Sequence, residues 1–142
     1  MDTIIVGVDA SDASTRAVEF AVDRAKHNHW QVVLVHVIPW SPFSFQTPEE
    51  NATRHAAKEK ELAAATEHIM KPAAELAEQG GVPHEEYVHH GRPSDTVLDL
   101  ARNHQAVHII IGRTGDSGLR AVFGSVASRL VQSSDVPVTV VP

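Results

Sequence analysis

The sequence predicts an α/β fold in which a five-stranded parallel sheet is covered by helices on both faces. Two observations predict it. Short runs rich in β-branched residues recur along the chain without alternating polar residues, as is typical of strands buried on both faces. Longer segments with helical spacing of apolar residues follow these runs, so that strand and helix alternate. With 142 residues, 42% of them hydrophobic, we expect residues 1–142 to form a single domain with its own core.

Five segments are predicted strands: Thr3–Val8, Gln31–Ile38, His84–His89, Val107–Ile111 and Val136–Val141. Four of them are apolar and β-branched, which favours buried positions in a sheet. The third is shorter and more polar, which favours a place near an edge. We expect the strand order 3-2-1-4-5. In such sheets ligands bind at the carboxyl ends of the strands, where the winding reverses.

Four helices are predicted between these strands. The first follows turn and N-cap residue types at Asp9–Asp12 and runs to about His27. The second spans about Glu49 to Gln79, with a kink at Pro72. The third begins near Pro93, and the fourth runs from Ser125 to about Ser133.

The stretch from Ile109 to Val126 carries the most informative functional signal. Its apolar strand ends on Gly112, and Gly115 follows, so the backbone there can adopt positive φ and approach a ligand closely. Gly124 and Ser125 then precede a helical segment. This layout directs backbone N–H groups, a hydroxyl and the positive end of a helix dipole at an anion. The alternative is a flexible connection in which Ser125 only caps the next helix.

Charge and cysteine content exclude several classes of function. With 12 basic and 18 acidic residues the net charge is −6, which argues against nucleic acid or an anionic membrane as the main partner. The chain has no cysteine, which excludes disulfides and thiol catalysis and is compatible with a reducing compartment. No apolar stretch reaches membrane-spanning length. We therefore expect a soluble cytoplasmic protein.

The chain resembles the universal stress proteins of the small, single-domain, ATP-binding type over nearly its whole length. The resemblance rests on Ile4–Ser11, Leu34–Val37, Gly91–Pro93, the glycine region and Val136–Val141. It implies a Rossmann-like sheet of the adenine nucleotide alpha hydrolase-like kind. The family's signature is Gly, two residues, Gly, nine residues, then Gly-Ser or Gly-Thr. Here only eight residues, 116–123, separate Gly115 from Gly124, which shortens the loop over the phosphates.

The resemblance implies an adenine nucleotide site. Asp9 would lie beside the ribose and phosphates, and Val37 would contact the adenine through its backbone. Independently of the resemblance, the Asp9 carboxylate suits a ribose hydroxyl or a water-mediated Mg²⁺ ion, and the alternative is a helix-capping aspartate. The full set of expected site residues is Gly7, Val8, Asp9, Val37, Ile111, Gly112, Arg113, Gly115, Gly124, Ser125 and Val126.

Three functions are compatible with such a site. The one we favour is a stress-response regulator that binds ATP, or AMP or ADP, with Mg²⁺ accompanying ATP, and signals through conformation or assembly. A slow ATP hydrolase would need a general base and a charge-stabilising cation, for which only Asp9 and Arg113 are available. A dimeric interaction module without nucleotide is favoured by the shortened loop.

Several other patterns in the sequence do not indicate a metal site or a hydrolase. The 10 histidines contain no His-Glu-x-x-His or comparable helical pair, and His36 is interpreted as a satisfied residue at the end of its strand. His108 is interpreted as a surface substitution. The chain lacks both a Gly-x-Ser-x-Gly motif and a P-loop. The aromatic residues Trp40, Phe43 and Phe45 fit a lid over the site, a subunit contact or a plug beneath the long helix.

The last strand predicts a homodimer. Residues Val136–Val141 are apolar, β-branched and at the sheet edge, and such an edge is a template for pairing with another chain. Pro137 removes one donor and limits pairing to a short segment. We expect a two-fold dimer through this strand, in line with the family, with a tetramer as a further step of assembly.

Overall fold

The computed structural model describes residues 1–40, 47–113 and 124–142 of the chain. Five parallel strands form one sheet in the order β3-β2-β1-β4-β5, which confirms the predicted fold and strand order. The strands are β1 (Thr3–Gly7), β2 (Gln31–Pro39), β3 (His84–Gly91), β4 (His108–Gly112) and β5 (Val138–Val141).

Strand boundaries differ from the predicted ones by up to two residues. β3 continues to Gly91, because it pairs with β2 as far as the Pro39–Gly91 register pair. β5 begins only at Val138, because Val136 and Pro137 belong to the approach to the strand. Pro137 still contributes its carbonyl, which accepts the N–H of Ile109 at 3.0 Å.

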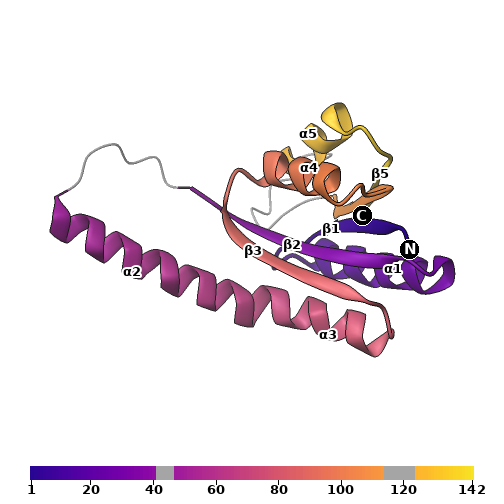
Figure 1. Cartoon of the computed structure of the whole chain (residues 1–142), viewed down its shortest axis with the longest axis horizontal. Coiled ribbons are helices and arrows are strands. Elements are labelled where there is room, and N and C mark those ends of the chain that lie inside the picture. The colour runs from indigo at the N-terminus through magenta and orange to yellow at the C-terminus, as the bar shows by residue number, and fades with distance from the viewer. Residues whose placement is uncertain (41–46, 114–123) are drawn as a thin grey trace.

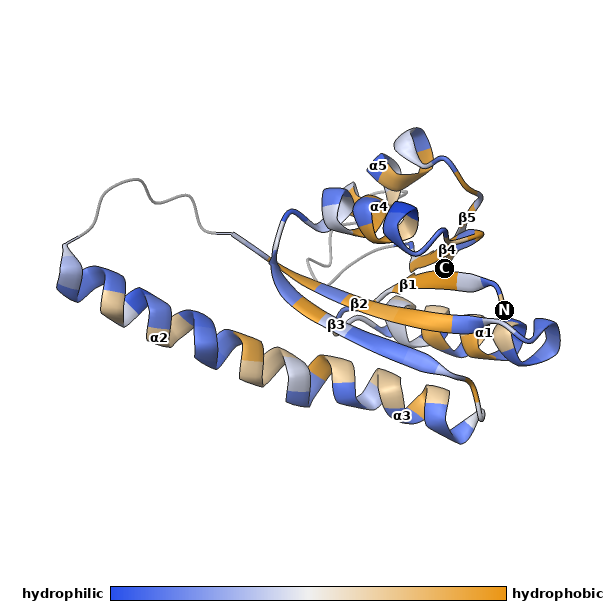
Figure 2. Cartoon of the chain, in the orientation of Figure 1, coloured by the Kyte–Doolittle hydropathy of each residue, from blue (hydrophilic) through white to orange (hydrophobic). Residues whose placement is uncertain are grey.

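Helices cover both faces of the sheet, as Figure 1 shows. On one face lie α1 (Asp12–Asn28) and α3 (Lys71–Gln79), and on the other lie α4 (Pro93–Asn103) and α5 (Ser125–Ser133). Two apolar clusters fill the spaces between these layers, and the apolar strands stand out against the polar outer surfaces of the helices (Figure 2).

The predicted long helix consists of three pieces. α2 (Pro48–Ala65) passes into a single π-helical turn, η1 (Thr66–Met70), which leads into α3. Pro72 accounts for the wide turn, since proline has no N–H to donate and its ring crowds the carbonyl one turn earlier. The Lys71 N–H accordingly donates to Thr66, five residues back. The kink expected at Pro72 is thus a π-turn directly before it.

α2 is anchored mainly at its C-terminal end. Ala65 is its buried residue, and Leu62 is half-buried. At its other end Thr47 and Glu50 form a capping box, which satisfies N–H groups that the helix leaves unbonded. Figure 1 shows the first turns of α2 projecting past the end of the sheet.

The β4–β5 pair contains a half-buried histidine. His108 lies on the α1 face of β4, where its Nε2 is 2.6 Å from the Thr139 hydroxyl oxygen of β5. Its ring centroid lies 6.4 Å from that of Trp30. The interpretation of His108 as a surface substitution is therefore wrong, because its side chain joins the two strands.

Burial lowers the pKa of His108 below its ordinary value of 6.5. The unfolded chain then binds this proton more readily than the folded chain, so stability falls as the pH drops through that value. We expect the free energy of unfolding of the intact chain to fall more steeply than that of His108→Gln, by up to about 1.4 kcal/mol per pH unit. Urea titrations between about pH 7 and pH 5 measure this difference.

The exposed His68→Gln variant is the control, and it should follow the intact chain. If the free energies of unfolding of the intact chain and of His108→Gln changed with pH in parallel, the lowered pKa of His108 would be contradicted.

Candidate functional site

A cavity of about 270 Å³ opens at the carboxyl ends of β1, β2 and β4. Its position follows from the strand order, because the chain winds outward from β1 in one direction and then in the other. Its walls are mostly apolar, with a few polar groups, as in most small-molecule sites. The lining residues are Gly7, Val8, Asp9, Ser14, Val35, His36, Val37, Pro39, Pro93, Val97, Ile111, Gly112, Gly124, Ser125, Val126 and Ala127.

Hydrogen bonds within the β1–α1 turn hold Asp9 at this cavity. Its backbone N–H donates to the hydroxyl oxygen of Ser14, which is 3% exposed, at 2.8 Å. Its carboxylate Oδ1 accepts the Ser11 N–H at 2.8 Å and the Ser11 hydroxyl. The Ser11 hydroxyl oxygen in turn accepts the Ser14 N–H, so Ser11 is the N-cap of α1. The alternative of Asp9 as the helix cap is therefore wrong: Asp9 positions the residue that caps.

The N-terminus of α5 forms another part of the cavity wall. Its N-cap is Gly124 in an extended conformation, and no side chain within the described residues caps it. The first hydrogen bond of the helix runs from Ser128 N–H to Gly124 carbonyl. The N–H groups of residues 125–127 therefore have no partner inside the helix, as expected for a first turn. Ser125 is the first helical residue, so its interpretation as the cap is wrong.

Two short backbone hydrogen bonds fix the approach to α5. Gly124 N–H donates to the Arg113 carbonyl at 2.6 Å, and Arg113 N–H donates to the Val141 carbonyl at 2.7 Å. Residues 113 and 124 are thereby joined to each other and to the end of β5. Arg113, which follows β4, and Gly124, which precedes α5, consequently lie side by side near the cavity.

Gly112 allows α1 to pass close to β4. A Cβ atom built on Gly112 would lie 2.9 Å from the carbonyl carbon of Ala13 and 3.0 Å from the N of Ser14. Any larger residue would push apart the first turn of α1 and the end of β4. Because Ser14 and Gly112 both line the cavity, this close approach also sets the cavity's shape.

His36 lines the cavity from β2, and its Nδ1 lies 2.7 Å from the carbonyl oxygen of Val8. That contact agrees with its interpretation as a satisfied residue at the strand end. It also ties β2 to the turn that holds Asp9.

The structure brings nine of the eleven expected site residues together around the cavity. Arg113 is an exception, because its side chain is exposed and does not line the cavity. Only its backbone contributes to this region, through its hydrogen bonds to Gly124 and Val141. Gly115 lies outside the described residues. Sequence reasoning did not assign seven lining residues to the site: Ser14, Val35, His36, Pro39, Pro93, Val97 and Ala127. For Ser14 the helical spacing after Ser11 was the available signal, and for Pro93 it was the Gly91–Pro93 motif.

The described residues place limits on other chemistry. Among them, no three His, Cys, Asp or Glu side chains are close enough together to form a metal site. No helix in the described part of the chain combines the length and apolar character needed to cross a membrane.

Comparison with known proteins agrees with the geometry. All of residues 1–142 match the Universal stress protein family. The chain belongs to this family. Universal stress protein MJ0531 of Methanocaldococcus jannaschii is 30% identical over 139 residues, which cover 97% of this chain and 80% of that protein.

Solved structures of universal stress proteins have the same fold. UspA from Lactobacillus plantarum superposes with a TM-score of 0.86 at 26% identity, covering 99% of this chain and 97% of that one. A universal stress protein in complex with cAMP has a TM-score of 0.65 at 25% identity, covering 99% of this chain and 95% of that one. The resemblance found in the sequence is thus confirmed at the level of family and fold.

We expect Ser14→Ala to destabilise this universal stress protein by about 1–3 kcal/mol, because the Asp9 N–H would lose its acceptor at a part-buried position. Urea unfolding followed by circular dichroism measures the change. Ser133→Ala, at the exposed end of α5, is the matched control and should change stability by less than about 0.5 kcal/mol. Equal stability of the two variants would show that the Asp9–Ser14 bond does not hold the turn.

Proposed function

We propose that the protein binds an adenine nucleotide in the cavity at the carboxyl ends of the strands, and that the bound nucleotide biases its conformation or assembly in a stress response. The observation that carries this proposal is the N-terminus of α5, which no side chain of the described residues caps and which lines the same cavity as Asp9. N–H groups without a partner inside the helix, together with the helix dipole, favour a phosphate there. The family member in complex with cAMP supports the same ligand class.

The cavity walls suit the three parts of a nucleotide. Val37 of β2 and Val97 of α4 are buried apolar residues of the cavity wall, where an adenine ring would fit. Gly124, Ser125 and Val126 would bind phosphate oxygens at the start of α5. Asp9, held by its turn, lies with Gly7 and Val8 at the end of β1, where we place the ribose.

We further propose that ATP is accompanied by Mg²⁺ near Asp9. A single carboxylate suits Mg²⁺, which keeps several waters and takes its other ligands from substrate phosphates. We also place the protein in the cytoplasm, which the absence of cysteine supports.

Nucleotide binding predicts a higher melting temperature in the presence of ligand. ATP with Mg²⁺, or AMP, at about 100 times its dissociation constant should add about 2.7 kcal/mol to stability. Thermal scans with ATP, AMP and GTP test both binding and the preference for adenine. Melting curves that none of these nucleotides shifts would instead support a nucleotide-free interaction module.

Two substitutions test separately the proposed phosphate contacts and the proposed Mg²⁺ ion. Gly124→Val should abolish binding with or without Mg²⁺, because a β-branched side chain would stand where the backbone must approach the phosphates. Asp9→Ala should weaken ATP binding more with Mg²⁺ than without it. Isothermal titration in magnesium buffer and in EDTA makes the comparison. If Asp9→Ala lost the same ATP affinity in both buffers, Asp9 would have no role in binding Mg²⁺. If Gly124→Val kept its affinity, the phosphates would not bind at the start of α5.

We propose a homodimer through the outer edge of β5. β5 is an edge strand, and all four of its residues are partly exposed. Val131 of the adjoining helix α5 is 52% exposed. An antiparallel pair of β5 strands would satisfy the open backbone groups and cover the valines, and the two-fold axis would close the assembly.

We expect the intact chain to be dimeric by light scattering at micromolar concentration and Val140→Lys to be monomeric, since a charge at the edge opposes pairing. Ser133→Lys adds the same charge on the exposed end of α5 and should remain dimeric. A monomeric intact chain, or a dimeric Val140→Lys variant that melts normally, would refute this interface.

A further inference from the structure

Ser14 carries a buried hydroxyl group whose hydrogen has no acceptor among the described residues. The residue lies in the first turn of α1 and is 3% exposed. Its hydroxyl oxygen accepts the Asp9 N–H at 2.8 Å, and its backbone N–H donates to the Ser11 hydroxyl oxygen at 3.1 Å. Neither bond uses the hydroxyl hydrogen, and the side chain forms no further hydrogen bond within the described part of the chain. A buried donor of this kind calls for a partner.

Two hollow spaces border Ser14, and an occupant of either could supply the acceptor. One is the cavity of about 270 Å³ described above. The other is a smaller pocket of about 150 Å³ between α1 and the η1–α3 segment. Gly112, the closest neighbour of Ser14 from β4, lines the larger cavity and not the smaller pocket. We therefore assign the hydroxyl hydrogen to the larger cavity.

The contacts of Ser14 place it between the ends of β1 and β4. Its hydroxyl oxygen holds the residue that follows the turn out of β1, and a Cβ atom built on Gly112 would lie 3.0 Å from the Ser14 N. The next residue, Arg113, accepts the Gly124 N–H at 2.6 Å through its carbonyl. Ser14 is thereby connected to the start of α5, where we place the phosphates. Val37, where we place the adenine, belongs to β2 on the other side of β1.

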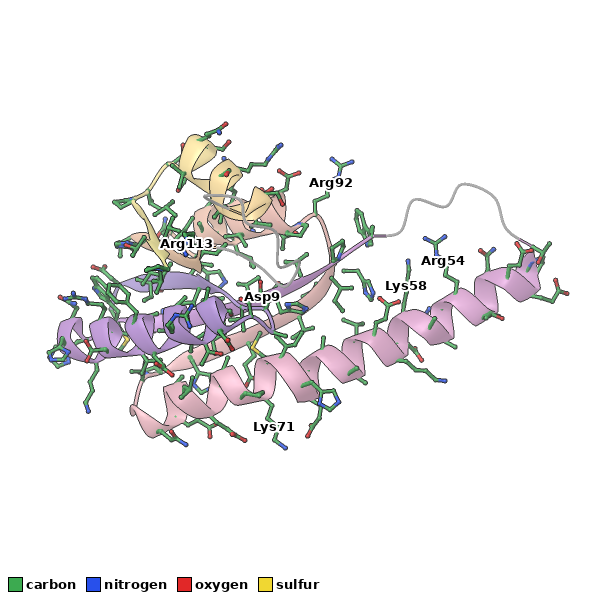
Figure 3. All side chains as sticks on the ribbon, turned by 180° about the vertical axis from the view of Figure 1, so that it is seen from behind. Asp9, Arg54, Lys58, Lys71, Arg92 and Arg113 are labelled. Carbon is green, nitrogen blue, oxygen red and sulfur yellow. The ribbon has the colours of Figure 1, made fainter. Side chains whose placement is uncertain are left out.

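Cationic side chains do not serve this part of the cavity. No lysine or arginine among the described residues lines it. Figure 3 shows Arg54 and Lys58 on α2, well separated from Asp9. The Arg113 side chain is exposed. Within the described residues, a phosphate therefore depends on neutral donors, which are the first N–H groups of α5 and the Ser14 hydroxyl.

We propose that the Ser14 hydroxyl donates a hydrogen bond to an oxygen of the phosphate attached to the ribose. This assignment rests on the proposed nucleotide function and adds a binding residue to it. A phosphate oxygen is an anionic acceptor, which makes the hydrogen bond stronger than one between neutral groups. The same hydroxyl oxygen holds the Asp9 N–H, beside which we place the ribose. One side chain thus aligns the ribose and its phosphate.

The test compares AMP with adenosine, which lacks the phosphate, by isothermal titration on the intact chain and on Ser14→Ala. The measured quantity is the ratio of the AMP affinity to the adenosine affinity. It should fall about tenfold or more in Ser14→Ala, because a hydrogen bond to a charged group is lost. The substitution also frees the Asp9 N–H, but that change acts on both ligands at the ribose and cancels in the ratio.

A second variant and a control accompany this comparison. Ser14→Cys keeps nearly the same side-chain size and offers only a weak donor, so its ratio should also fall. The matched control is Thr3→Val, since Thr3 is 5% exposed and its hydroxyl oxygen accepts Nε2 of Gln31 at 2.7 Å. This change removes a buried hydroxyl at the amino end of β1, away from the cavity. Its ratio should stay within about twofold of that of the intact chain.

The outcomes distinguish this assignment from the proposed function. If both Ser14 variants lost AMP and adenosine affinity equally, the assignment would be overturned, the nucleotide site would stand, and the hydroxyl hydrogen would belong to the smaller pocket. A fall in the Thr3→Val ratio as large as that of Ser14→Ala would also overturn it. An intact chain that bound neither ligand would contradict the proposed function itself and the assignment with it.

Discussion

The burial of β1 on both faces is the constraint on which the rest of the structure depends. Ile4, Ile5 and Val6 are all 0% exposed, so each face of the central strand needs its own covering layer. Helical crossovers between parallel strands supply both layers and bring every strand back in the same direction. The carboxyl ends of β1, β2 and β4 therefore meet at one edge, and the order of the strands leaves a crevice there. The site is a consequence of how the core is covered.

The polar part of the site depends on two helix N-termini that are treated differently. α1 satisfies its first turn with Ser11, which Asp9 positions, whereas α5 begins on a glycine with no side-chain cap among the described residues. Within the described residues, the cavity therefore has a carboxylate at the start of α1 and, at the start of α5, backbone N–H groups without a partner inside the helix. The proposed positions of the ribose and the phosphates depend on this difference.

The sequence predicted the fold and strand order, because the buried strands are almost uninterrupted β-branched runs that alternate with helical segments. Together with the family resemblance, it predicted nine cavity residues, which stand at strand ends or at the start of α5, where position along the chain fixes position in space. It could not predict the neighbours supplied by distant elements, such as His36 against the Val8 carbonyl or Ser14 beneath Asp9. The same holds for His108, whose partner Thr139 lies 31 residues away. The sequence predicted only a kink at Pro72 and not the π-turn. Pro72 removes one helical hydrogen bond, but its presence does not determine which other hydrogen bond forms.

The bonds that join Arg113, Gly124 and Val141 have a thermodynamic consequence. The last residue of β5 holds the Arg113 N–H, and the Arg113 carbonyl holds the N–H of the α5 cap. The outermost strand and the start of α5 are therefore both hydrogen-bonded to one residue, Arg113. If ordering the end of β5 stabilises the start of α5 through this residue, linkage requires that ordering the start of α5 stabilise the end of β5 to the same extent. In a universal stress protein built this way, the outer edge of the sheet and the α5 side of the cavity are connected through a single residue.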